Sequence, residues 1–161
     1  MTMKKKSIPA SNNAAELGGN LRKTNTEKIK EINGQKIKEI NGQLVMDRDM
    51  EFKGYLIVRG DIVGKDGERY NLEVNGRLYV AGSIYIRNLD IKGNTEVDGN
   101  IDVWGNIRAK GNIIAYGYTK VTGNIDVWGE IYTRKLYVLS ENIRRHGVKH
   151  WLDLIRRQWK G

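Results

Sequence analysis

Hydrophobic and polar residues alternate along most of the chain, and glycine interrupts the alternation at a regular interval. Between residues 93 and 131, glycine recurs at every sixth residue. The odd-numbered positions between these glycines are apolar or small, and the even-numbered ones are mostly polar, charged or aromatic. An alternation with period two is typical of strands that bury one face. A strand of four or five residues cannot bury that face alone, so the pattern predicts segments stacked into a β-solenoid.

A longer repeat overlies the six-residue one and suggests the length of one coil. The pattern first seen in FKGYLIVRGDI begins at Phe52, Val74, Val97 and Val121, so it recurs after nearly four hexads. Solenoids grow by duplication of whole coils, so we expect coils of about 22 to 24 residues rather than of three hexads. That spacing places Trp104 beneath Trp128 and predicts ladders of like side chains on the outer surface.

Glycine also marks the expected corners and loops. Several asparagines directly follow a glycine, and Gly-Asn suits a corner that needs positive φ; among them are Asn100, Asn106, Asn112 and Asn124. Residues 64–70, GKDGERY, break the hexads between two strands and are interpreted as an exposed loop. We therefore expect a solenoid over residues 27–139, wound in a right-handed sense because right-handed crossovers predominate.

The N-terminal region has two parts. Residues 1–26 are rich in Lys, Ser, Asn and Thr without sustained periodicity, which predicts a flexible basic arm. The octapeptide KIKEINGQ then occurs twice, at residues 28–35 and 36–43. It suits either one helical turn stopped by Asn-Gly or strands joined by tight Asn-Gly turns. We favour strands that begin the solenoid or cover its first coil.

The period changes after Leu139. Ser140 suits an N-cap, and apolar residues then follow at helical spacing, which predicts an amphipathic capping helix over residues 140–161: Val148, Trp151, Leu152, Ile155 and Trp159. Its opposite face carries basic residues that could contact phosphate or an anionic membrane, among them Arg144, Arg145, Arg156 and Arg157.

Composition narrows the range of functions. The net charge of +9 is concentrated at the two ends, because residues 51–139 carry twelve Lys or Arg against eleven Asp or Glu. Cysteine is absent, so no thiolate nucleophile or thiolate metal site is expected. No apolar run has the length of a membrane span, and the N-terminus lacks the apolar region of a secretory signal, so we expect a cytoplasmic protein.

Candidate catalytic chemistry is sparse. His146 and His150 have a spacing that could place two imidazoles on one metal, but no third ligand is evident. The acids Asp98, Asp102 and Asp126 point outward and are interpreted as a polar ladder. The solenoid has no histidine of the kind that hexapeptide acyltransferases use. We therefore expect that the protein is not an enzyme and that it binds no cofactor, metal or small-molecule substrate.

Residues 52–138, with their repeated G-x-L/I-x-V-x-G-x-I motif, resemble the bactofilins, which are polymer-forming bacterial cytoskeletal proteins. The resemblance implies a β-helix flanked by flexible tails and assembled end to end without nucleotide. The expected coil is longer than the bactofilin one, and a C-terminal helix would block stacking at that end. The resemblance is one of architecture.

Aromatic side chains on the outer surface suggest a covered surface. By parity these residues, with one arginine, form a candidate interaction surface: Tyr79, Tyr85, Trp104, Arg108, Tyr116, Tyr118, Trp128 and Tyr132. The covering could be a second copy of the chain, nucleic acid stacked on the rings, or carbohydrate. We favour a self-associating structural scaffold, as a filament, an oligomer or a virion-type assembly. A solenoid that binds nucleic acid through basic termini and outward aromatics is the alternative.

Overall fold

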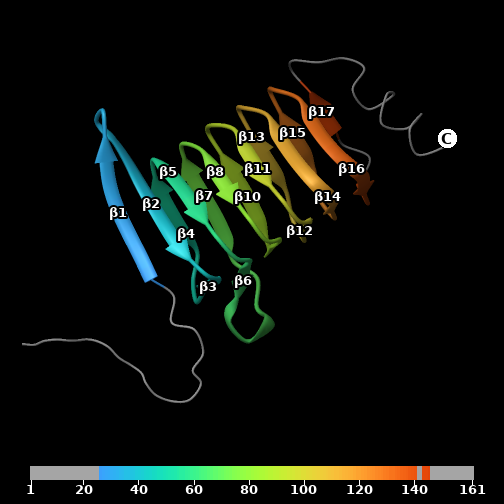
Figure 1. Cartoon of the computed structure of the whole chain (residues 1–161). Helices are drawn as coiled ribbons and strands as arrows, with labels where there is room; N and C mark the ends of the chain where they lie inside the picture. Colours follow the sequence, from blue (N-terminus) through green and yellow to red (C-terminus); the bar gives the residue numbers. More distant parts are fainter. Residues whose placement is uncertain (1–25, 141–142, 146–161) are drawn as a thin grey trace, which may run out of the picture.

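The computed structural model describes residues 26–140 and 143–145, and in this part of the chain the protein is a parallel β-solenoid of about six coils (Figure 1). The expected all-β solenoid class is confirmed. The right-handed winding stays a prediction from the sequence.

The strands are short and follow one another around the coils. Their bounds are β1 Thr26–Ile32, β2 Gln35–Asn41, β3 Leu44–Met46, β4 Met50–Lys53, β5 Tyr55–Val58, β6 Ile62–Gly64, β7 Asn71–Asn75, β8 Leu78–Val80, β9 Ile84–Ile86, β10 Asn88–Ile91, β11 Thr95–Val97, β12 Ile101–Val103, β13 Ile107–Ala109, β14 Ile113–Val121, β15 Ile125–Val127, β16 Ile131–Val138 and β17 Ile143–Arg145. A 3-10 turn, η3, occupies Lys65–Gly67.

Each coil contributes one strand to each of three faces. Face 1 consists of β2, β5, β8, β11 and the first halves of β14 and β16. Face 2 consists of β3, β6, β9, β12 and the second halves of β14 and β16. Face 3 consists of β4, β7, β10, β13, β15 and β17. Faces 1 and 2 form one hydrogen-bonded sheet because β14 and β16 continue through the corner between them.

The regular coil consists of three hexads, so the longer coil expected from the sequence repeat is wrong. Ile107 pairs with Ile125, and Ile113 pairs with Ile131, each eighteen positions later. Trp104 consequently lies beside Thr122, whose hydroxyl donates a hydrogen bond to the Trp104 carbonyl oxygen. Trp104 does not lie beneath Trp128.

Two irregular coils explain why the sequence repeat was misleading. The loop after β6 lengthens one coil, so that Leu56 pairs with Leu78, twenty-two positions later. One missing residue at Asn88 shortens the next coil, and Leu72 pairs with Leu89, seventeen positions later. The interpretation of residues 64–70 as an exposed loop is confirmed for residues 65–68, which include η3. Arg69 and Tyr70 are half-buried.

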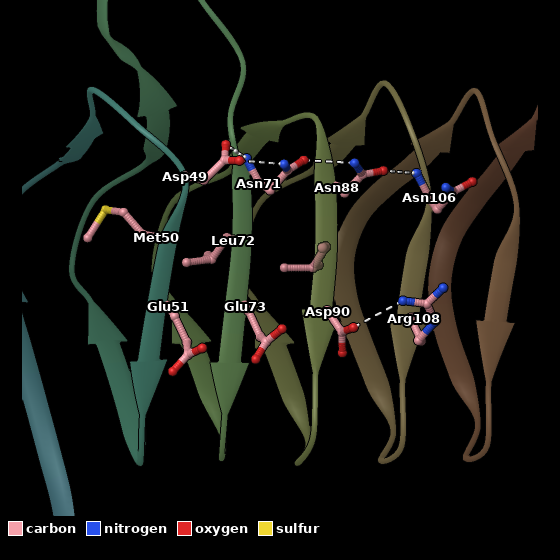
Figure 2. A pocket seen from close by; sticks show the side chains of 11 residues that line it. Asp49, Met50, Glu51, Asn71, Leu72, Glu73, Asn88, Asp90, Asn106 and Arg108 are labelled. Carbon is pink, nitrogen blue, oxygen red and sulfur yellow. Dashed lines mark hydrogen bonds and ion pairs between the residues drawn. The ribbon is translucent and has the colours of Figure 1, made fainter.

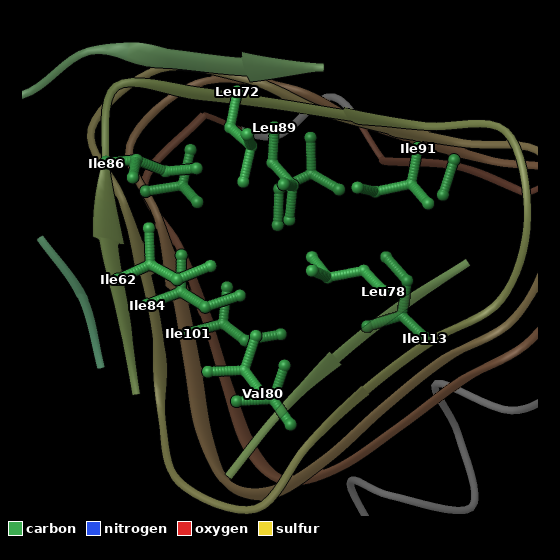
Figure 3. Packing of buried hydrophobic residues seen from close by; sticks show 14 of the residues in the cluster. Ile62, Leu72, Leu78, Val80, Ile84, Ile86, Leu89, Ile91, Ile101 and Ile113 are labelled. Carbon is green, nitrogen blue, oxygen red and sulfur yellow. The ribbon is translucent and has the colours of Figure 1, made fainter. Parts of the chain in front are cut away.

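The core is a column of aliphatic side chains enclosed by the coils (Figure 3). The odd-numbered positions identified from the sequence are all buried, from Val97 through Ile131. Stacked aliphatic residues exclude water along the whole column, and burial of this kind contributes about 25 cal/mol for each Å² of apolar surface. The period-two interpretation is confirmed in this region.

The corner glycines have a different role from the expected one. Gly105 and the other glycines of the hexads are not among the residues with positive φ. A Cβ on Gly105 would lie 2.8 Å from the carbonyl oxygen of Arg87 in the preceding coil, and closer still to Oδ1 of Asn88. Glycine is therefore required by the close stacking of coils, while the asparagines form ladders, as where the Asn106 amide donates to Asn88 Oδ1 at 2.7 Å.

The N-terminal repeat forms strands, as expected. β1 and β2 make an antiparallel hairpin through Asn33 and Gly34, which have φ values of 52° and 77°. β2 pairs in parallel with β5 and starts the first coil, while β1 extends face 1 by one strand at the end of the solenoid (Figure 1).

Charged residues lie on the core side of this hairpin. Lys38 pairs with Leu56, so it shares the row of core-facing residues, and its Nζ lies 3.3 Å from Oε1 of Glu27. Inward-pointing charges on an edge strand discourage the pairing of a further strand. The hairpin is thus a polar cap for the N-terminal end.

The C-terminal end differs from the expectation. A helix from Ser140 is contradicted at residues 143–145, which form β17 and pair in parallel with β15. Ser140 is no N-cap, because its hydroxyl donates to the Gly123 carbonyl oxygen at 2.6 Å and continues the stacking of the coils. The hydrogen-bonded ladder of face 3 overrides the local helical spacing there. The rest of the predicted helix, including its apolar residues, lies outside the described residues, as does nearly all of the predicted arm.

Candidate interaction faces

Every coil presents one central outward side chain on each face, and these side chains form three rows along the solenoid. Register fixes the order of each row from the first coil to the sixth. The row of face 1 is Glu39, Ile57, Tyr79, Glu96, Ile114 and Tyr132. The row of face 2 is Val45, Val63, Tyr85, Asp102, Lys120 and Tyr137. The row of face 3 is Glu51, Glu73, Asp90, Arg108, Asp126 and Arg144.

Face 1 combines aliphatic and tyrosine side chains with tightly paired charges. The Arg59 guanidinium lies 2.7 Å from Oε2 of Glu39 and 5.9 Å from the centre of the Tyr79 ring. The hydrogen bond from Arg59 holds the pKa of the Glu39 carboxyl below its usual value. In the central row of this face, the half-buried Ile57 and Ile114 point outward. Aliphatic side chains at outward positions of a sheet suit contact with another surface.

Two tyrosine hydroxyls on face 1 donate to neighbouring carboxylates. Tyr79 donates to Oδ2 of Asp98 at 2.7 Å, and Tyr132 donates to Oε1 of Glu130 at 2.6 Å. Each bond raises the pKa of its tyrosine, because the hydroxyl proton is shared with an anion. These bonds hold both tyrosine hydroxyls beside carboxylates of the same face.

Face 2 is partly covered by the loop that follows β6. The loop projects from the outline of the coils (Figure 1), and Arg69, near its end, returns onto the face. The Arg69 guanidinium lies 4.1 Å from the centre of the Trp104 ring and donates to the Asp102 carbonyl oxygen at 3.0 Å. The side chains of Arg69 and Asp102 are only 16% and 13% exposed. The loop is therefore anchored two coils away from its own position.

Tyrosines gather beside this anchor. The rings of Tyr118 and Tyr137 meet edge to face with their centres 6.1 Å apart. Desolvation raises the pKa of Tyr118, and the nearby Asp102 carboxyl adds to the effect. Face 2 is thus an aromatic face whose centre is occupied by the chain's own arginine.

Face 3 carries charges and amides around a shallow groove of about 420 Å³ (Figure 2). Asp90 accepts ion pairs from Lys92 at 3.1 Å and Arg108 at 3.2 Å. Beside the charged row runs a ladder in which Asp49 accepts hydrogen bonds from the Asn71 amide and side chain, at 2.9 Å and 2.8 Å. These bonds lower the pKa of Asp49. The groove is lined by four carboxylates, Asp49, Glu51, Glu73 and Asp90, and by one cation, Arg108, so its charge is mainly negative.

The candidate surface residues chosen from the sequence lie on three faces rather than one. Tyr79 and Tyr132 belong to face 1, and Tyr116 lies at its border with face 2. Face 2 carries Tyr85, Tyr118 and Trp104, whereas face 3 carries Arg108 and, at its border with face 1, Trp128. Tyr79, Tyr85 and Tyr118 are half-buried, and the other five are exposed. They cannot act as a single contiguous surface.

Sequence reasoning missed Arg69, Ile57 and Ile114. The contact between Arg69 and Asp102 spans 33 residues and depends on the true coil length. The two isoleucines had a detectable pattern, because they are apolar at positions whose parity points outward. Of the predicted anion contacts, Arg144 lies exposed on face 3 and Arg145 follows it in β17, while Arg156 and Arg157 lie outside the described residues.

Residues 26–140 and 143–145 contain no cluster of three or more His, Asp or Glu placed to hold a metal ion. Within the same part of the chain, no helix has the length and apolar character needed to cross a membrane. Comparison with models of known protein families, with curated proteins and with solved structures finds no significant match. The class that the structure defines is therefore that of parallel β-solenoids whose regular coil consists of three hexads.

Proposed function

We propose that this protein is a non-catalytic structural scaffold that self-associates through the sides of its β-solenoid. The observation that carries the proposal is the exposure of large apolar side chains on its outer surface. Trp104, Tyr116, Trp128 and Tyr132 are 59%, 58%, 55% and 48% exposed. Single exposed apolar residues are ordinary, but several large ones on so small a solenoid are typical of a surface that meets a partner, and Tyr132 and Tyr116 lie on or beside face 1.

The polar hairpin cap directs the contact to the sides. A copy stacked on the N-terminal end would have to bury the Lys38 and Glu27 charges beside its own core, and burying charge is costly. Lateral packing of flat faces avoids this cost. The proposal includes the right-handed winding and the cytoplasmic location expected from the sequence, and it replaces the end-to-end assembly that the resemblance to bactofilins implies with lateral association.

The charge pattern favours a scaffold function over the alternative function of binding nucleic acid. On the outer faces of the solenoid, Arg59 pairs with Glu39 and Arg108 pairs with Asp90. Phosphate would have to compete with these carboxylates. A stripe of uncompensated cations is the usual mark of a nucleic-acid surface.

The test is the mass of the full chain in solution. Light scattering and sedimentation velocity over a hundredfold range of concentration should show dimers or larger species, and electron microscopy should show whether they extend into filaments. A chain that stays monomeric at the highest concentration would overturn the scaffold function. Fluorescence anisotropy with a labelled single-stranded oligonucleotide then tests the alternative, which predicts binding that weakens with salt.

A further inference from the structure

We propose that face 1 is a two-fold interface between two copies of this chain, packed face to face with their solenoid axes antiparallel. In this arrangement Ile57 of each copy faces Ile114 of the second copy. The inference rests on the scaffold function proposed above and names the surface and the partner that serve it.

The geometry follows from the symmetry of a pair of flat faces. A two-fold axis parallel to the strands reverses the order of the coils, so the first coil faces the sixth, the second the fifth and the third the fourth. Such an interface is isologous, and each contact occurs twice. The order of the central row along the solenoid therefore determines which residues face each other.

Face 1 places no two charges of the same sign opposite each other in its central row. Ile57 meets Ile114, Glu39 meets the ring of Tyr132, and Tyr79 meets Glu96.

The residues at the exit corner of face 1 are also compatible. Arg59 meets Tyr116, which is 58% exposed and can accept a guanidinium on its ring. Asp98 meets Ala81, and Arg134 meets Asn41. Face 1 places no two charges of the same sign opposite each other at these positions.

The other two faces fail the same test. On face 3 the arrangement opposes Glu73 with Asp126, and Lys92 with Lys110. Charges of like sign placed opposite each other suppress association. On face 2 the projecting loop and Arg69 stand between the sheet and any flat partner.

The alignment of the two copies along the solenoid axis, which is the register of the interface, is specified as well. A shift of one coil in one direction places Glu96 opposite itself, and the shift in the other direction places Ile57 opposite Glu96. Each shift loses the aliphatic pair and sets a carboxylate against an incompatible group. The unshifted register is the one that keeps both glutamates away from each other and from the isoleucines.

The size of the face sets the expected affinity. Six strands about 4.8 Å apart and five residues of about 3.3 Å each give a face of roughly 400 Å² in projection. Stable interfaces usually bury about 800 Å² per partner, so we expect a weak and reversible dimer. A trapping experiment suits such an equilibrium.

Cysteine cross-linking tests the proposal, because the chain has no cysteine of its own. The double variant Ile57→Cys, Ile114→Cys places thiols across both halves of the interface, at the roughly 10 Å separation of facing sheets. Within one copy the two thiols are three coils apart, about 14 Å, which is beyond the span of a short bismaleimide. The reagent should therefore convert the double variant, at concentrations where the full chain associates, into a covalent dimer on denaturing gels.

Two controls make the result specific. Either cysteine alone faces an isoleucine and should give no dimer. The pair Glu73→Cys, Asp126→Cys has the same coil positions on face 3, and it should also give none because Lys92 still lies opposite Lys110. Cross-linking of the face 3 pair, with none of the face 1 pair, would overturn the assignment of the interface to face 1. Association seen by light scattering would in that case still support the scaffold function. A monomeric chain would overturn both.

A charge exchange provides a second measurement that does not depend on cysteine. Ile114→Lys should weaken dimerisation at least tenfold, because it buries an ammonium against Ile57. Adding Ile57→Glu in the same chain should restore most of the loss by pairing the two charges across the axis. Melting followed by circular dichroism shows that each variant folds. Folded variants with unchanged association would contradict the interface.

Discussion

Residues 99–105 and 123–129 have the same sequence, GNIDVWG, and lie in different surroundings. The first segment contains β12 on face 2, and the second contains β15 on face 3. Asp102 of the first segment lies between Tyr85 and Lys120, whereas Asp126 of the second lies between Arg108 and Arg144. The two tryptophans likewise lie at different corners of the coil.

The difference shows that a hexad determines which side chains are buried but not what the outward side chains contact. Both segments bury their isoleucine and valine, because the alternation is local. Their outward residues depend on the hexads one coil before and one coil after. The sequence repeats after four hexads and the structure after three, so identical segments are carried to different faces.

The largest expected effect concerns the part that the two segments share. Ile101 and Ile125 are 0% and 1% exposed, and each stacks in a closed aliphatic column. Ile101→Ala and Ile125→Ala should each lower the free energy of unfolding by about 2–5 kcal/mol, by loss of burial and creation of a cavity. Urea unfolding measures both. A loss well under about 1 kcal/mol at either position would show that the core is not continuous there.

The glycines that end the two segments provide the next comparison. A Cβ on Gly105 would lie 2.8 Å from the Arg87 carbonyl oxygen, and one on Gly129 would lie 2.7 Å from the Gly111 carbonyl oxygen. Gly105→Ala and Gly129→Ala should each cost about 1–3 kcal/mol, because backbone atoms of the preceding coil must shift. Thermal melting should show losses of similar size. A neutral result at one site would mean that the coils separate there.

Some of the fold can be predicted from the sequence because it depends on local patterns. Alternation identified the buried positions from Val97 to Ile131, and Asn33-Gly34 identified the N-terminal hairpin. Coil length could not be obtained in this way, since a register of three or of four hexads buries the same side chains. Only the contacts between coils, such as the ladder from Asn88 to Asn106, distinguish the two.

The candidate surface was less predictable than the core. Parity placed the tyrosines and tryptophans outside, but assigning them to faces required the coil length. The strand at Ile143 was missed because helical spacing over the following residues outweighed a three-residue segment whose pairing with β15 is a long-range contact. Arg69 was treated as part of a solvated loop, since its partners Asp102 and Trp104 lie two coils further along the chain.

The asparagines beneath the two segments should differ in importance. Asn88 accepts from the Asn106 amide at 2.7 Å and donates from Nδ2 to Asn71 at 2.7 Å, whereas Asn112 accepts from the Glu130 amide at 2.9 Å. Asn88→Ala should cost about 1–2 kcal/mol and Asn112→Ala about 1 kcal/mol, because each leaves a backbone amide without its acceptor. Amide hydrogen exchange at residues 106 and 130 should be faster in the matching variant only. Unchanged exchange at either amide would contradict its ladder bond.

The smallest expected effect separates the two tryptophans. Arg69 lies over the Trp104 ring, so the double-mutant cycle of Arg69→Ala with Trp104→Ala should give a coupling of about 0.5–1 kcal/mol. The matched cycle of Arg69→Ala with Trp128→Ala should give a coupling near zero, because Trp128 lies at the corner between face 3 and face 1. Equilibrium unfolding of the six proteins provides both values. Equal couplings would mean that Arg69 affects the stability of the whole solenoid rather than the first segment through a local contact. The two copies of GNIDVWG would then differ only in the charged residues beside them.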